Sequence, residues 1–201
     1  MVLAGQWLER PALVDAGDAT LEALYHRGAR RPALVLCPSP GPGGGMDAPP
    51  LAEIAWAAAR AGHPSLRFQH RGVGASQGTL DPARAVDDAL AAFRHLADTA
   101  GPRLAVAALG GGAATALAIA RARPEVERLV LVAPDALPGE AVGARVLVLL
   151  PEAGAALSRA DAEGRLGTAA RVEVVDGADA AFRSGLPEVG RRAVAWIASR
   201  A

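Results

Sequence analysis

Lysine and asparagine are absent from this chain, and cysteine and aromatic residues are scarce. Because every basic side chain other than histidine is arginine, the chain has no amine for Schiff-base or Ser–Lys chemistry. The single cysteine, Cys37, excludes an internal disulfide and fits a reducing compartment, so we expect a cytoplasmic protein. Aromatic residues make up 3% of the chain, so the core is expected to consist of aliphatic side chains.

Charge and apolar patterning exclude several classes of partner. The 21 basic and 21 acidic residues balance without a basic run, so we expect no nucleic-acid partner. Residues 1–10 lack the basic and apolar regions of a signal peptide. The most apolar stretch, 104–120, is short and interrupted by glycines, which favours a buried strand and helix over a membrane span. The four histidines are dispersed, so we expect no metal site and no cofactor.

Short apolar runs alternate with helical patterns along the whole chain, without a linker or repeat. This alternation predicts one α/β domain over residues 1–201, with a mostly parallel sheet covered by helices on both faces. Strands are predicted at 11–16, 20–26, 32–37, 65–70, 104–109, 127–133, 144–150 and 171–175, the first two as a hairpin. Helices are predicted at 47–61, from the Asp81 cap, after the 104–109 strand and at 187–200.

Three consecutive glycines follow the strand at 104–109 and precede an alanine-rich helix. Strand, sharp turn and helix form the layout of the nucleophile elbow G-x-S-x-G, in which a strained turn exposes the nucleophile. Here Gly110 occupies the serine position, and Ala108 occupies that of the preceding glycine. Glycine has no side chain with which to attack a substrate, so the elbow lacks its nucleophile.

Together with the elbow, two more motifs resemble the small, capless α/β-hydrolase family of dienelactone-hydrolase-like bacterial proteins. Residues 37–47 (CPSPGPGGGMD) are similar to that family's H-P-H-P-x-x-G-G-x-M-D-N loop. Residues 66–78 (LRFQHRGVGASQG) are similar to its L-R-F-N-F-R-G-V-G-x-S-x-G motif. The resemblance implies an α/β-hydrolase fold, and the short link at 135–143 leaves no room for a cap domain.

The triad residues that the resemblance implies are missing. The nucleophile position is Gly110, the acid position after the penultimate strand is Gly154, and the base position after the last strand is Ala180. Both histidines of the H-P-H-P loop are also replaced, by Cys37 and Ser39. Loss of all three positions argues against acyl transfer by this triad. We therefore expect a degenerate hydrolase that binds a small anionic or apolar ligand or assembles with a protein partner or a second copy.

A rewired active site is the alternative interpretation. The family's strand order places the 32–37 strand between the 65–70 strand and the elbow strand, so Cys37, Ser39 and His70 would gather at one sheet edge. A Cys or Ser paired with a His is suited to nucleophilic catalysis. Cys37 also closes an apolar strand, which favours a small buried hydrophobe, and His70 stands where the family usually has a packing aromatic.

The glycine turn allows two further interpretations. Gly110 and Gly111 present backbone N–H groups at a helix N-terminus, which favours an anion, although a sharp turn also requires glycine. Gly110-x-Gly112, with Asp135 beyond the next strand, also resembles the dinucleotide-binding motif G-x-G-x-x-G with its acidic ribose contact. However, Thr115 occupies the third position, where that motif needs Gly or Ala. The predicted ligand-binding residues are therefore Cys37, Ser39, His70, Gly110 and Gly111.

Two polar residues of the 66–78 motif are predicted to be structural. Arg71 is expected to anchor the loop through ion pairs or carbonyl contacts. Ser76 is expected to bond the backbone of the turn. It is not the expected nucleophile, because intact members of the family share it and use another serine.

Overall fold

The computed structural model describes residues 8–41, 44–139 and 142–199. Its strands form one eight-stranded sheet in the order β1-β2-β4-β3-β5-β6-β7-β8. The pairs β1–β2 and β2–β4 are antiparallel, and all the other pairs are parallel. The strands are β1 (Glu9–Asp15), β2 (Thr20–His26), β3 (Ala33–Cys37), β4 (Ser65–Phe68), β5 (Leu104–Leu109), β6 (Arg128–Val132), β7 (Arg145–Pro151) and β8 (Ala170–Val175).

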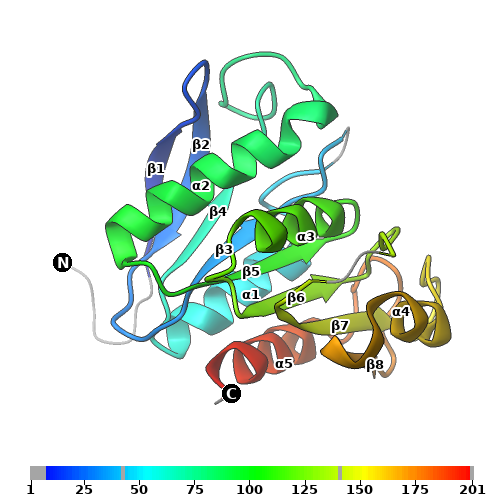
Figure 1. The fold of residues 1–201 in the computed structure, drawn as a ribbon. Helices are drawn as coiled ribbons and strands as arrows, with labels where there is room; N and C mark the ends of the chain where they lie inside the picture. Colours follow the sequence, from blue (N-terminus) through cyan, green and yellow to red (C-terminus); the bar gives the residue numbers. More distant parts are fainter. Residues whose placement is uncertain (1–7, 42–43, 140–141, 200–201) are drawn as a thin grey trace.

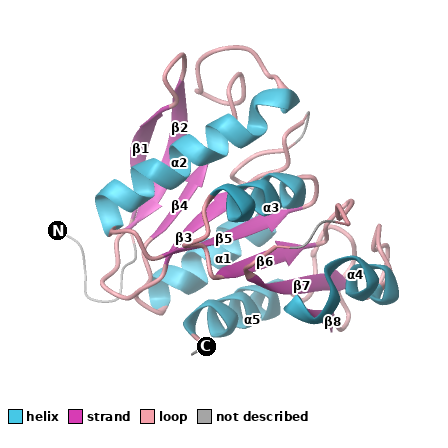
Figure 2. Cartoon of the chain, viewed as in Figure 1, coloured by secondary structure: helices cyan, strands magenta, loops and turns pink. Residues whose placement is uncertain are grey.

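Helices cover both faces of the sheet (Figures 1 and 2). The helices are α1 (Pro49–Arg60), α2 (Ala85–Ala100), α3 (Gly112–Ala122), α4 (Arg159–Leu166) and α5 (Leu186–Ala198). Helices α1 and α5 pack on one face, and α2, α3 and α4 pack on the other, so the apolar core lies in two layers around the sheet. The predicted α/β class and the position of β3 between β4 and β5 are confirmed. The single-domain organisation over 1–201 stays a prediction.

Several strand and helix boundaries in the structure differ from those predicted from the sequence. The strand predicted at 65–70 ends at Phe68, because the chain then turns through Gly72 and Gly74, which have φ of +70° and +58°. The helix predicted from residue 47 begins at Pro49, with both prolines in its first turn. Asp81 does act as a cap, but of a 3-10 turn (Pro82–Arg84) that leads into α2.

Helix α4 was not predicted from the sequence. Only Ala162 and Leu166 of its side chains are buried, so the apolar periodicity is too weak to indicate a helix. A local signal was present, since Ser158 and Asp161 form a capping box at its start. Within the described ranges, every helix is too short or too polar to cross a membrane.

The loop of the 66–78 motif is anchored on a buried ion pair. Asp88 of α2 is fully buried and accepts hydrogen bonds from the Arg71 backbone N (3.0 Å), Nε (2.9 Å) and Nη2 (2.7 Å). Ser76 Oγ accepts from the Glu22 N–H (2.9 Å) and donates to the Gln69 carbonyl (3.1 Å). The predicted structural roles of Arg71 and Ser76 are confirmed.

Candidate functional site

The predicted strand–turn–helix at the elbow is present in the structure. Strand β5 ends at Leu109, Gly110 turns the chain with a φ of +55°, and α3 begins at Gly112. A Cβ placed on Gly112 would lie 2.7 Å from the carbonyl oxygens of Cys37 and Pro38. Only glycine permits so close an approach of α3 to the end of β3.

A hydroxyl and a carboxylate flank the elbow. A Cβ placed on Gly111 would lie 2.8 Å from Ser39 Oγ and 3.4 Å from Asp135 Oδ2. A Cβ placed on Gly110 would lie 3.3 Å from the same Asp135 oxygen. From the sequence, Asp135 is indicated only as a ribose contact, and its position beside the elbow comes from the structure. The signal was its place just after the strand that neighbours the elbow strand, because the carboxyl ends of parallel strands meet at one sheet edge.

Gly111 provides an unused backbone donor at the elbow. Within the described part of the chain, the Gly111 N–H has no hydrogen-bond partner. A second donor is expected from the 37–45 loop, but residues 42–43 of that loop lie outside the described residues. Because the Asp135 carboxylate lies beside Gly111, the site pairs a donor with a negatively charged acceptor. That arrangement suits a hydroxyl or other neutral polar group better than an anion.

The acid and base positions implied by the resemblance lie side by side, but neither has a functional group. A Cβ placed on Gly154 would lie 3.1 Å from the Ala180 Cβ. The nearby Glu152 accepts a hydrogen bond from the Gly177 N–H at 2.5 Å, which joins the two loops. The fold therefore still brings these two loop positions together without the carboxylate and imidazole of a triad.

The ring nitrogens of His70 contact groups other than the side chains of the predicted site residues. Its buried ring places Nε2 3.3 Å from the Pro38 carbonyl oxygen and Nδ1 3.4 Å from Asp88 Oδ2, and it packs edge-on against Phe68. In the described part of the chain, no hydrogen bond joins His70 to Cys37 or Ser39. The three residues share one sheet edge without forming a nucleophile–base pair. The described residues also contain no group of three or more His, Cys, Asp or Glu placed to hold a metal.

Cys37 is placed as a core residue. It is fully buried at the end of β3, and burial raises the pKa of its thiol to about 12.

We expect no reaction of the native protein with a disulfide reagent at pH 8. Thiolate is the reactive form, and its population at Cys37 is lower than that of an ordinary cysteine by about a thousandfold or more. Absorbance of the released thiol should rise only after denaturation. Rapid labelling of the native chain would contradict a buried, inert thiol.

Solved structures decide the fold. An α/β serine hydrolase homologue from Coxiella burnetii matches with a TM-score of 0.81 and 22% identity over 96% of this chain and 98% of that chain. A serine hydrolase without a lid from Xanthomonas campestris matches with a TM-score of 0.73 and 19% identity over 100% of both chains. This chain has the α/β-hydrolase fold. A dienelactone hydrolase from Anabaena variabilis shares this fold with a TM-score of 0.76 and 21% identity, over 95% of this chain and 97% of its own.

The α/β-hydrolase fold predicted from the motifs is therefore confirmed. The described residues between β6 and β7 form no helix or strand, which agrees with the predicted absence of a cap. No family model and no curated protein matches the sequence. At 19–22% identity, the solved neighbours establish the fold alone.

Proposed function

We propose that this α/β-hydrolase-fold protein has lost serine-hydrolase chemistry and acts by binding. Its ligand would be a small molecule at the elbow, or its partner would be another protein or a second copy of the chain. The observation that carries this proposal is the triad layout without triad groups. Gly110 forms the elbow, and Gly154 and Ala180 lie in contact after β7 and β8. Loss of one group is compatible with relocation, whereas loss of all three favours loss of the chemistry.

The groups around the elbow restrict the class of small ligand. The free Gly111 N–H supports an acceptor on the ligand, and Ser39 Oγ supports either a donor or an acceptor. The Asp135 carboxylate disfavours the anionic ligand that the glycines by themselves indicate, because like charges repel at this distance. We therefore propose a neutral polar group, such as a hydroxyl, with apolar substituents as the alternative class.

One observation favours the rewired enzyme as a second candidate. Ser39 Oγ lies at the elbow, close to where a nucleophile would act. Its predicted base, His70, contacts the Pro38 carbonyl and Asp88 instead. A serine without a general base is a weak nucleophile, so the binding function has the stronger support.

A fluorophosphonate probe should leave the native protein unlabelled, because no serine in the described site has a base to activate it. p-Nitrophenyl acetate should be hydrolysed no faster than with a non-enzymatic control protein. Mass spectrometry of the labelled digest is the direct measurement, with an active serine esterase labelled in parallel. A label on Ser39 or Ser76 would establish the rewired enzyme and overturn the binding proposal.

Asp135→Asn should strengthen the binding of small anions at the elbow. Removing the carboxylate removes a repulsion of about 1 kcal/mol at an exposed site, which corresponds to roughly a fivefold gain in affinity. Acetate titrations followed by NMR chemical shifts of the Gly111 amide would measure it. Asp98→Asn, an exposed change of the same charge on α2, is the matched control. Equal affinities in the parent and Asp135→Asn would show that Asp135 does not govern this site.

A further inference from the structure

A row of arginines lies at the end of the sheet opposite the elbow. The parallel strands β3, β5, β6 and β7 are neighbours, and each has an arginine at its first residue or within the two residues before it. We call these four residues the arginine row: Arg31, Arg103, Arg128 and Arg145. Among the described residues, no carboxylate lies within 4.0 Å of any of them. Neighbouring strands therefore bring together positive charge that the structure does not neutralise.

Arg128 is a buried cation with no carboxylate within 4.0 Å among the described residues. Its residue is 5% exposed, its Nη2 donates to the Ser199 carbonyl at 3.0 Å, and its Nη1 has no partner. Burial and the neighbouring Arg145 lower the pKa of Arg128, while Glu127 opposes them. Buried guanidinium groups are normally paired, because removing an unpaired charge from water is costly. In the part of the chain that the structure describes, no acceptor reaches the Arg128 Nη1 atom.

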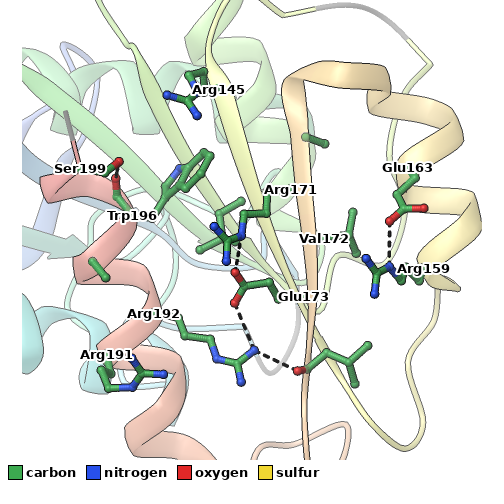
Figure 3. A pocket seen from close by; sticks show the side chains of 14 residues that line it. Arg145, Arg159, Glu163, Arg171, Val172, Glu173, Arg191, Arg192, Trp196 and Ser199 are labelled. Carbon is green, nitrogen blue, oxygen red and sulfur yellow. Dashed lines mark hydrogen bonds and ion pairs between the residues drawn. The ribbon is translucent and has the colours of Figure 1, made fainter. Parts of the chain in front are cut away.

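Arg145 and Trp196 extend the same cluster. Arg145 lies directly opposite Arg128 in the β6–β7 register, and both guanidinium carbons lie 5.2 Å from the centre of the Trp196 ring. Figure 3 shows Arg145 beside this ring. Cation–π contacts offset part of the repulsion between the two arginines. The indole Nε1 of Trp196, a residue 9% exposed, also has no hydrogen-bond partner among the described residues.

A cavity adjoins the arginine row. Its volume is about 260 Å³, and Arg31, Arg103 and Arg128 line it together with Ser199. Glu125 and Glu127 are its acidic lining residues. Glu125 is already paired with Arg123, at 3.3 Å. Positive charge is thus in excess around the cavity, and one of its arginines is almost fully buried.

A second, larger cavity nearby differs from the first in its charge balance. Its volume is about 980 Å³, and it lies along β8 between α4 and α5 (Figure 3). Arg171 and Arg192 both pair with Glu173 there, at 2.5 and 3.1 Å. Arg159 pairs with Glu163 at 2.8 Å. Arg145 of the arginine row also lines this larger cavity, where the other arginines are neutralised within the protein. The smaller cavity has three arginines, Arg31, Arg103 and Arg128, that have no described carboxylate within 4.0 Å, so it is better suited to an external anion.

We propose that the 260 Å³ cavity binds the oxyanion group of a small molecule, a phosphate or a carboxylate, through Arg31, Arg103 and Arg128. Guanidinium groups form paired, charge-assisted hydrogen bonds with both kinds of group. The bound oxyanion supplies the counter-charge that buried Arg128 lacks. The site is independent of the proposed function at the elbow, because it lies at the amino ends of the strands.

Thermal unfolding of the full chain, residues 200 and 201 included, tests the proposal. The melting temperature should rise and then saturate as sodium phosphate replaces sodium chloride at constant ionic strength and pH 7. Arg103→Gln, at an exposed position, should raise the half-saturating concentration about tenfold, the effect expected for one charged hydrogen-bonding partner. Arg94→Gln on α2, which changes the same charge outside the cavity, should leave it unchanged.

Two further arms complete the test. Acetate in place of phosphate distinguishes a carboxylate site from a phosphate site, and a saturable response to either supports the proposal. Arg128→Met should abolish the rise in melting temperature. If this substitution of a buried residue prevents folding, Arg103→Gln still tests the proposal. Equal melting temperatures in phosphate and chloride, or equal effects of Arg103→Gln and Arg94→Gln, would overturn the proposal.

Discussion

Gly110→Ser alone should leave ester hydrolysis at the level of the parent chain. The new hydroxyl would have no imidazole at position 180, and loss of the base from a serine triad costs on the order of a millionfold in rate. The substitution also places a side chain at a φ of +55°, with its Cβ 3.3 Å from an Asp135 oxygen. Initial rates with p-nitrophenyl acetate and fluorophosphonate labelling measure the result.

Introducing the triad residues one at a time tests whether the general base limits hydrolysis. We expect measurable turnover only when Ala180→His accompanies Gly110→Ser, and a further gain from Gly154→Asp. That gain is limited, because Gly154 has a φ of +76° and its Cβ would press on residue 180 at 3.1 Å. Gly110→Ala with Ala180→His is the matched control, since it has the elbow strain without a nucleophile. Strong hydrolysis by Gly110→Ser alone would show that an unrecognised base already faces the elbow.

Asp88→Ala should lower the free energy of unfolding by about 3–5 kcal/mol, the usual effect of removing one partner of a buried ion pair. It leaves the Arg71 guanidinium, in a residue 5% exposed, without its main acceptor and removes the charge facing His70. Urea unfolding measures the change. Asp87→Ala is the adjacent control, because Asp87 is exposed and its partner among the described residues is the partly exposed Arg84. Similar losses for the two variants would contradict a dominant role for the buried pair.

The same ion pair should make stability depend on pH in the acid range. Burial alone would raise the pKa of Asp88, but the His70 and Arg71 contacts outweigh it and hold the pKa below its ordinary value. Since the folded pKa lies below the unfolded one, the stabilisation is complete above about pH 4 and is lost as pH falls through the folded pKa. The difference between the parent and Asp88→Ala should therefore shrink below pH 4. A constant difference from pH 7 to pH 2 would contradict this linkage.

Local patterns in the sequence were enough to predict the architecture and to identify the residues at the positions where the resemblance implies a triad. Apolar runs separated by helical periodicity indicate a parallel α/β sheet, because each element must bury its own apolar face. The 66–78 motif indicated the roles of Arg71 and Ser76, since its glycines and polar residues act within one loop. The absence of a nucleophile at Gly110 is likewise visible without coordinates.

Contacts between distant segments were decided only by the tertiary structure. Asp135 lies beside the elbow because β6 follows β5 in the sheet, and His70 faces Asp88 because α2 packs over the loop. The arginine row joins positions 31, 103, 128 and 145, which form no run in the sequence. Strand order and side-chain direction bring such residues together, and neither is contained in the local periodicity of any one segment.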